Sequence, residues 1–145
     1  MMKTFVYALF LMGICISAAA QTKKPDAKAT APSAVVMERG KAVYTTNCLP
    51  CHQEDGSGVP HLNPPLTPNE WVAGAKPRLI NLVLHGSQGQ VVIDGDRWSN
   101  NMPANTHLTD AQIADVLTYV RHSFGNNAGA ISAAEVKAER AKKKS

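Results

Sequence analysis

Cys48-Leu49-Pro50-Cys51-His52 is the stretch of sequence that decides the fold. Its two thiols stand three residues apart, so each can form a thioether to a vinyl side arm of one porphyrin. The adjacent His52 can then place a neutral imidazole nitrogen under the iron. This C-x-x-C-H spacing is typical of covalent attachment of a c-type haem. It predicts one haem c, its linkage through Cys48 and Cys51, and His52 as one axial ligand.

A C-x-x-C pair has two other common uses. A redox-active dithiol normally opens a helix inside a strand–helix–strand pattern, and no such pattern surrounds Cys48. A zinc site needs two further Cys or His ligands at matching spacing, whereas the one remaining cysteine of the chain is Cys15. The spacing therefore favours haem attachment over both alternatives.

Residues 1–20 are typical of a secretory signal peptide. Lys3 precedes an apolar run over residues 5–16, and Ala18-Ala19-Ala20 offers a cleavage site. The run is shorter than the roughly 20 residues that a membrane-spanning helix needs. We expect cleavage after Ala20 and an exported, periplasmic, soluble protein with no stable membrane span after signal cleavage. An uncleaved signal or a lipidated Cys15 that anchors the chain is the alternative.

Composition divides the rest of the chain into three parts. Residues 21–33 predict a flexible linker, residues 34–127 one domain, and residues 128–145 a basic C-terminal tail. Ser132 and Glu135 are spaced as a capping box, so the tail is either a short docked helix or a solvated, frayed segment. The net charge of +4 comes from the ends, because residues 34–127 hold 6 basic and 8 acidic residues. Basic residues do not alternate with aromatics on any one element, which argues against nucleic acid as a partner.

Hydrophobic periodicity predicts that the domain is all-α. The expected helices span residues 34–47, 77–85 and 109–124. The last is the clearest, since Thr109 and Gln112 form a capping box at its start. Asp94-Gly95 suits a two-residue turn in a minor β-hairpin. A domain of this size has a marginal apolar core, so a buried haem would supply much of it.

Met102 is the residue predicted to bind the open face of the iron. It lies within the polar sequence Asn101-Met102-Pro103, where a methionine has little use in packing. A thioether ligand there would raise the reduction potential. Met37, ahead of the haem motif, is interpreted as a core or surface residue of the first helix. His85 and His107 are the rival ligands of a bis-His site.

In order and spacing, the sequence resembles the class I c-type cytochromes over residues 35–127. The matching pieces are Gly40-Lys41-Ala42-Val43-Tyr44, Cys48-Leu49-Pro50-Cys51-His52, Pro64-Pro65-Leu66, Met102-Pro103 and Leu117-Thr118-Tyr119-Val120. Two further stretches, Asp55-Gly56-Ser57-Gly58-Val59-Pro60 and Leu84-His85-Gly86, are similar to small cytochrome c domains found beside periplasmic dehydrogenases and oxidoreductases.

The resemblance implies a cytochrome c-like fold around one covalently bound haem. In that fold the first and last helices cross near one haem edge, so Gly40 would permit close approach where Tyr44 meets Val116 and Tyr119.

The resemblance also implies how the haem is held. A carbonyl near Pro64 or Pro65 would accept the Nδ1 hydrogen of His52, which fixes the tautomer of the ring and raises its basicity. Leu66 would press on the porphyrin. Candidates for haem-wall or propionate contacts are Trp71, Arg97 and Trp98.

The function implied is one-electron transfer, with the iron alternating between Fe(III) and Fe(II) while His52 and Met102 stay bound. No catalytic residue is expected, and the partners would be a periplasmic dehydrogenase, oxidase or reductase. A haem enzyme such as a peroxidase, a ligand-binding sensor with a displaceable distal ligand, and a dedicated cytochrome subunit of one oxidoreductase complex are the alternatives. Because residues 34–127 are net acidic, docking is expected to use an apolar patch at residues 48–51 with local charges, or the basic ends, in place of a lysine ring.

Overall fold

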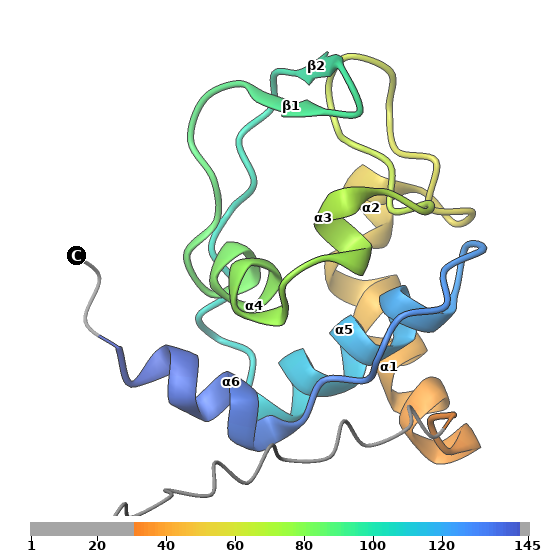
Figure 1. Cartoon of the computed structure of the whole chain (residues 1–145), viewed down its shortest axis with the longest axis vertical. Helices are drawn as coiled ribbons and strands as arrows, with labels where there is room; N and C mark the ends of the chain where they lie inside the picture. The colour runs from red at the N-terminus through yellow and green to blue at the C-terminus, as the bar shows by residue number, and fades with distance from the viewer. Residues whose placement is uncertain (1–30, 143–145) are drawn as a thin grey trace, which may run out of the picture.

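Helices α1 (Ala34–Asn47) and α5 (Asp110–His122) cross and form the most extensive contact between elements in the computed structural model, which describes residues 31–142. The remaining elements are α2 (Leu49–His52), α3 (Glu70–Ala73), α4 (Lys76–His85), β1 (Val91–Ile93), β2 (Asp96–Trp98) and α6 (Ala133–Arg140). The two strands form a small hairpin at the far end of the molecule from α6 (Figure 1). The expected helix-dominated fold with a minor hairpin is confirmed.

The crossing of α1 and α5 depends on Gly40. A Cβ atom at this position would clash with the backbone carbonyl of Asp115 and lie 2.6 Å from Cβ of Tyr119. One turn later Tyr44 packs its ring 5.5 Å from that of Tyr119 and 5.2 Å from that of Phe124, measured between centroids. The close approach of the two helices at Gly40 is therefore as expected, and only a residue without a side chain fits there.

The caps of the helices follow the local sequence signals. Thr109 caps α5 in a complete capping box with Gln112, so the helix begins where the sequence indicated. Helix α4 has proline in its first turn and ends at Gly86, whose φ is 71°. In the hairpin turn Asp94 and Gly95 both have positive φ, 52° and 89°, which is the geometry of a two-residue type I′ connection.

Helix α6 docks on α4 and α5 (Figure 1). Its Val136 is fully buried, and Ile131 in the segment before it is 5% exposed. Of the two alternatives that the sequence left for residues 128–145, the structure shows the docked helix as far as Arg140.

The predicted signal peptide and almost all of the predicted linker lie outside the described residues, as do the last three residues of the tail. Within residues 31–142, no helix has both the length and the apolar composition needed to cross a bilayer.

Candidate functional site

A cavity opens among the helices and loops of the fold. The empty space in it is about 1190 Å³ when the open solvent at its mouth is included. The residues that line it come from α2, the loop after it, α3, α4, β1, the loop before α5, and α5 itself. The lining includes the residues predicted to attach the haem and to bind its iron: Cys48, Cys51, His52 and Met102. Residues that are far apart in the sequence therefore line the same space.

His52 is oriented by one carbonyl oxygen. Its Nδ1 lies 2.9 Å from the oxygen of Pro64. A carbonyl only accepts hydrogen bonds, so Nδ1 must carry the hydrogen and Nε2 is left with its lone pair. Burial lowers the pKa of His52, which favours the neutral ring. Of the two prolines that the resemblance proposed as acceptors, the structure thus places Pro64 against the ring, and Pro65 lines the cavity.

Gly58 sets the position of the Pro64 carbonyl. Its N–H donates to the carbonyl of His52 at 3.1 Å, and its φ is 70°. A Cβ at residue 58 would lie 2.7 Å from the oxygen of Pro64 and would clash with the carbonyl of Asn63. The turn that returns the chain to His52 therefore needs glycine at residue 58 for two reasons: the positive φ, and the lack of room for a Cβ atom. The sequence motif contained this glycine, but its contact with Pro64 follows only from the structure.

Cys48 does not have the character of a reactive thiol. Cys48 is partly buried, and burial together with the nearby Cys51 raises its pKa to about 11. A catalytic dithiol needs a lowered thiol pKa, because the thiolate is the nucleophile. A zinc centre is disfavoured as well, since residues 31–142 contain no cluster of three or more His, Cys, Asp or Glu side chains able to hold a metal ion.

Met102 is attached to the end of α4. Its carbonyl accepts from the N–H of Ser87 at 3.0 Å, and its own N–H lies 3.4 Å from the Ser87 hydroxyl oxygen. Gly86 makes this approach possible, because a Cβ there would clash with the carbonyl of Met102. Further along, the N–H of Asn105 donates to the carbonyl of Val83 at 2.9 Å. The sequence predicted only that Gly86 ends the helix. Its second role, to leave room for the carbonyl of Met102, depends on a loop sixteen residues away.

The rival ligands lie elsewhere. Met37, His85 and His107 are absent from the cavity lining. The ring of His107 is on the surface, where its Nε2 lies 3.2 Å from the side-chain oxygen of Asn47. Of the four candidates for the second ligand, Met102 is the one that lines the cavity together with His52 in the described part of the chain.

The predicted wall residues divide into two groups. Leu66 and Trp71 line the cavity together with Pro65, whereas Trp98 and Arg97 do not. Arg97 donates to the side-chain oxygen of Gln90 at 2.9 Å. Trp98 is paired across the hairpin with Val91, a lining residue, so it lies on the same face of the hairpin. The role of Trp98 toward the haem stays a prediction.

The residues present fit a haem. The lining is mainly apolar, and it holds one neutral imidazole and one thioether, both of which suit iron. The indole N–H groups of Trp71 and Trp98 are buried and have no hydrogen-bond partner among residues 31–142. Buried donors without an acceptor are uncommon, and the propionates of a haem would supply acceptors of the right charge.

The sequence analysis did not single out the asparagines around the cavity. Asn47, Asn63, Asn100, Asn101 and Asn105 contribute to the lining. Asn63 and Asn100 join the loop after α2 to the loop of Met102, with 3.0 Å between Nδ2 of Asn100 and Oδ1 of Asn63. The sequence shows many asparagines in these loops. Asparagine is also common in ordinary turns, so its frequency alone does not predict a site.

The crossing helices, the C-x-x-C-H motif and the cavity define a c-type haem protein. The Cytochrome c family model matches residues 37–124, and the chain belongs to this family, whose members carry a covalently bound haem c. Its features are those of a class I c-type cytochrome.

Several curated proteins are similar to the chain. A cytochrome c-552 of Thermus thermophilus is 34% identical over 119 residues, which cover 76% of this chain and 80% of that protein. The cytochrome c subunit of alcohol dehydrogenase (quinone) from Gluconacetobacter polyoxogenes is 37% identical over 103 residues, 67% of this chain and 21% of that subunit. The gluconate 2-dehydrogenase cytochrome c subunit of Pantoea cypripedii is 36% identical over 96 residues, 64% of this chain and 22% of that subunit. The chain thus spans about a fifth of the length of these dehydrogenase subunits.

Proposed function

We propose that the protein is an electron carrier that holds one haem c through Cys48 and Cys51, with His52 and Met102 as axial ligands. The observation that carries the proposal is the shared cavity, in which the oriented His52 and the anchored Met102 face the same space. The bound haem supplies an iron that alternates between Fe(III) and Fe(II).

The residues of the chain have separate tasks in this function. The Pro64 carbonyl keeps Nδ1 of His52 protonated, so that Nε2 is the nitrogen available to the metal. Met102 offers a neutral, soft sulfur, which favours the reduced state of the iron and raises the potential. The apolar walls that include Leu66, Leu79 and Val83 exclude water. Ligands that are held in place in both oxidation states keep reorganisation small.

An enzyme or a sensor would need a distal position that opens readily. The loop of residues 102–108 is instead hydrogen-bonded to Val83 of α4 and to Ser87, which follows α4. This favours a carrier over a peroxidase or a gas sensor, both of which need a free or displaceable sixth position on the iron. A dedicated subunit of one oxidoreductase differs from a free carrier only in how long it stays with its partner.

The partner is proposed by similarity. Relatives include cytochrome c subunits of alcohol, gluconate and fructose dehydrogenases and a subunit of a cbb3-type cytochrome c oxidase. We propose a dehydrogenase or an oxidase as redox partner, in the periplasm, reached after export with residues 1–20 as signal peptide.

An optical spectrum of the oxidised protein tests the ligand assignment. Sulfur-ligated ferric haem has a weak long-wavelength band, and Met102→Ala is expected to abolish this band and to lower the reduction potential. Met37→Ala is the matched control, because Met37 lies outside the cavity, and it should change neither quantity. A band that survives Met102→Ala, or a wild-type protein that is high-spin when oxidised, would contradict the proposed ligation.

A further inference from the structure

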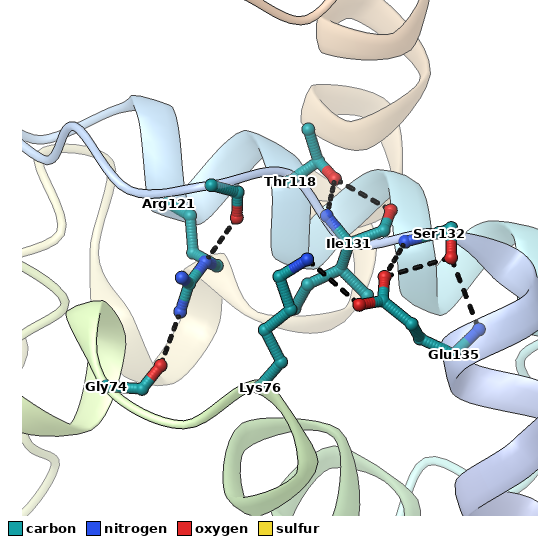
Figure 2. A network of polar contacts seen from close by, with 8 residues as sticks. Gly74, Lys76, Thr118, Arg121, Ile131, Ser132 and Glu135 are labelled. Atoms are coloured by element: carbon teal, nitrogen blue, oxygen red, sulfur yellow. Dashed lines mark hydrogen bonds and ion pairs between the residues drawn. The ribbon is translucent and has the colours of Figure 1, made fainter. Parts of the chain in front are cut away.

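The chain turns back after α5 and is held there by buried hydrogen bonds. The hydroxyl of Thr118 donates to the carbonyl of Ile131 at 3.1 Å and accepts from its N–H at 2.9 Å. Arg121 Nε donates to the carbonyl of Gly129 at 2.7 Å, and the same guanidinium reaches the carbonyl of Gly74 (Figure 2). Thr118 and Arg121 are 1% and 4% exposed. Buried bonds of this kind are costly to leave unmade, so the segment that leads into α6 has one defined course.

Helix α6 is then fastened to α4. Lys76 Nζ lies 2.9 Å from a carboxylate oxygen of Glu135 (Figure 2), and Asn81 Nδ2 donates to Glu139 at 2.8 Å. Val136 belongs to the same buried cluster as the apolar residues of α4. The C-terminal end of α4 holds the beginning of the Met102 loop, defined here as residues 102–108. Helix α6 therefore supports the helix to which this loop is attached.

Arg140, at the end of α6, contacts the other end of the same loop. Its Nη2 donates to the carbonyl of Leu108 at 2.8 Å, and its Nε forms an ion pair with Asp110 at 2.7 Å. Leu108 lines the cavity, and Asp110 is the first residue of α5. The guanidinium thus joins the end of the loop to the beginning of the following helix.

We propose that Arg140 is a positioning residue for the Met102 loop and that α6 is a support which keeps this loop closed over the cavity. The inference rests on the proposed function for its consequence, namely a long-lived bond between Met102 and the iron. It goes beyond the family assignment, because α6 lies outside residues 37–124 that the family model matches.

The loop has few other means of staying in place. Of its seven residues, only Met102 and Leu108 carry large apolar side chains, and most of the others are exposed. Segments with few buried contacts open more readily than the rest of a fold. Holding the loop from α4 at one end and from α6 at the other limits this opening.

Hydrogen exchange of the haem-loaded, full-length protein tests the proposal. The N–H of Asn105 bonds to Val83 and the N–H of Leu108 bonds to Asn105, so both amides report whether the loop is closed. Arg140→Ala is expected to speed exchange at these two amides by about three- to tenfold. A change of this size is expected because the variant loses a partly exposed ion pair and one hydrogen bond. Arg140→Lys should give a smaller increase, because lysine keeps the charge but not the forked geometry.

Arg39→Ala is the matched control. Arg39 pairs with Asp115 at 2.6 Å and joins α1 to α5, away from the Met102 loop. This variant should leave exchange at Asn105 and Leu108 unchanged. The proposal is overturned if Arg140→Ala leaves the loop amides as in the wild type, or if it speeds exchange equally in α1 and in the loop.

The two proposals can fail separately. A wild-type protein without the long-wavelength band would remove Met102 as ligand, while the exchange comparison would still decide whether α6 holds the loop. If the band is present, Arg140→Ala should make it disappear at a lower temperature than Arg39→Ala does. Equal temperatures would overturn the inference and leave the ligand assignment standing.

Discussion

The hydrogen bond between His52 and Pro64 determines how strongly the imidazole donates to a metal. A ring whose Nδ1–H is bonded to a carbonyl is a more basic ligand than a free one, and a more basic ligand stabilises the ferric state. The carbonyl stays in reach because Gly58 leaves room for it. A residue that never touches the haem is therefore expected to influence the potential.

Gly58→Ala tests this dependence. The new Cβ would meet the oxygen of Pro64, so the carbonyl must move away from His52. We expect the reduction potential to rise, because the weakened bond makes the ring less basic, and the protein to lose about 2 kcal/mol or more of stability from the positive φ and the clash. Potentiometric titration and thermal unfolding of the loaded protein measure the two effects.

Gly95→Ala is the control for the backbone strain alone. Gly95 also has a positive φ, 89°, but a Cβ there would meet no atom within 4 Å. It should cost about 1 kcal/mol and leave the potential unchanged. A potential that rises equally in both variants, or in neither, would show that the Pro64 carbonyl does not act through His52.

At the level of residues, the sequence predicted what local spacing determines. The prediction for Cys48, Cys51 and His52 needed only the spacing within one turn of chain, and the structure places all three residues in the cavity lining. The choice between Pro64 and Pro65 was not predictable, because it depends on how the turn at Gly58 returns to His52. Trp98 was predicted at the haem from residue type alone; it is not among the residues that line the cavity, and its contact with the haem stays a prediction.

Among the elements, α1 and α5 form the most extensive contact. At their crossing Gly40 leaves no room for even one methyl group, since Asp115 and Tyr119 of α5 already occupy that space. The rings of Tyr44 and Tyr119 pack beside this point. Any increase in the distance between the helices would loosen that aromatic cluster.

Gly40→Ala is therefore expected to destabilise the protein by about 2–3 kcal/mol, the cost of overpacking a close contact. The sign is informative, because alanine in place of glycine inside a helix otherwise stabilises it by about 1 kcal/mol. Chemical unfolding of the haem-loaded protein gives the difference. Gly129→Ala, whose Cβ would approach only Lys76 at 4.0 Å, should change stability little. A stabilised Gly40→Ala variant would mean that the crossing is looser than described.

The elements also show where prediction from sequence stops. Helices α4 and α5 have strong periodicity and clear caps, so their bounds were predicted within one or two residues. Helix α6 has a capping box but little apolar content, and its docking depends on groups of α4 and α5 such as Asn81, Thr118 and Arg121. No local pattern reports such partners, so the sequence left two alternatives.

For the whole molecule, the distribution of charge around the cavity is the feature that bears on partners. The residues that line the cavity include no Asp, Glu, Lys or Arg within the described part of the chain. Polar groups at the lining are the imidazole of His52, the two thiols, asparagines, one serine and the indole of Trp71. The basic side chains Lys137, Arg140 and Lys142 lie on or just after α6. The lining of the cavity thus holds no carboxylate, ammonium or guanidinium group, and these three basic side chains lie on a different part of the chain.

A neutral cavity predicts that electron transfer depends little on salt. At an ionic strength of about 0.1 M, charges more than roughly 10 Å apart are largely screened, so only groups near the haem edge still act on an incoming reagent. We expect the rates with an anionic reagent, ferricyanide, and with a cationic ruthenium ammine complex to change by less than about twofold between roughly 0.1 and 0.5 M salt. Stopped-flow mixing with the oxidised or reduced protein measures both rates. With a lysine ring the anionic reagent would slow steeply and the cationic one would speed up, and that opposite pair of trends is the result that would refute a neutral docking edge.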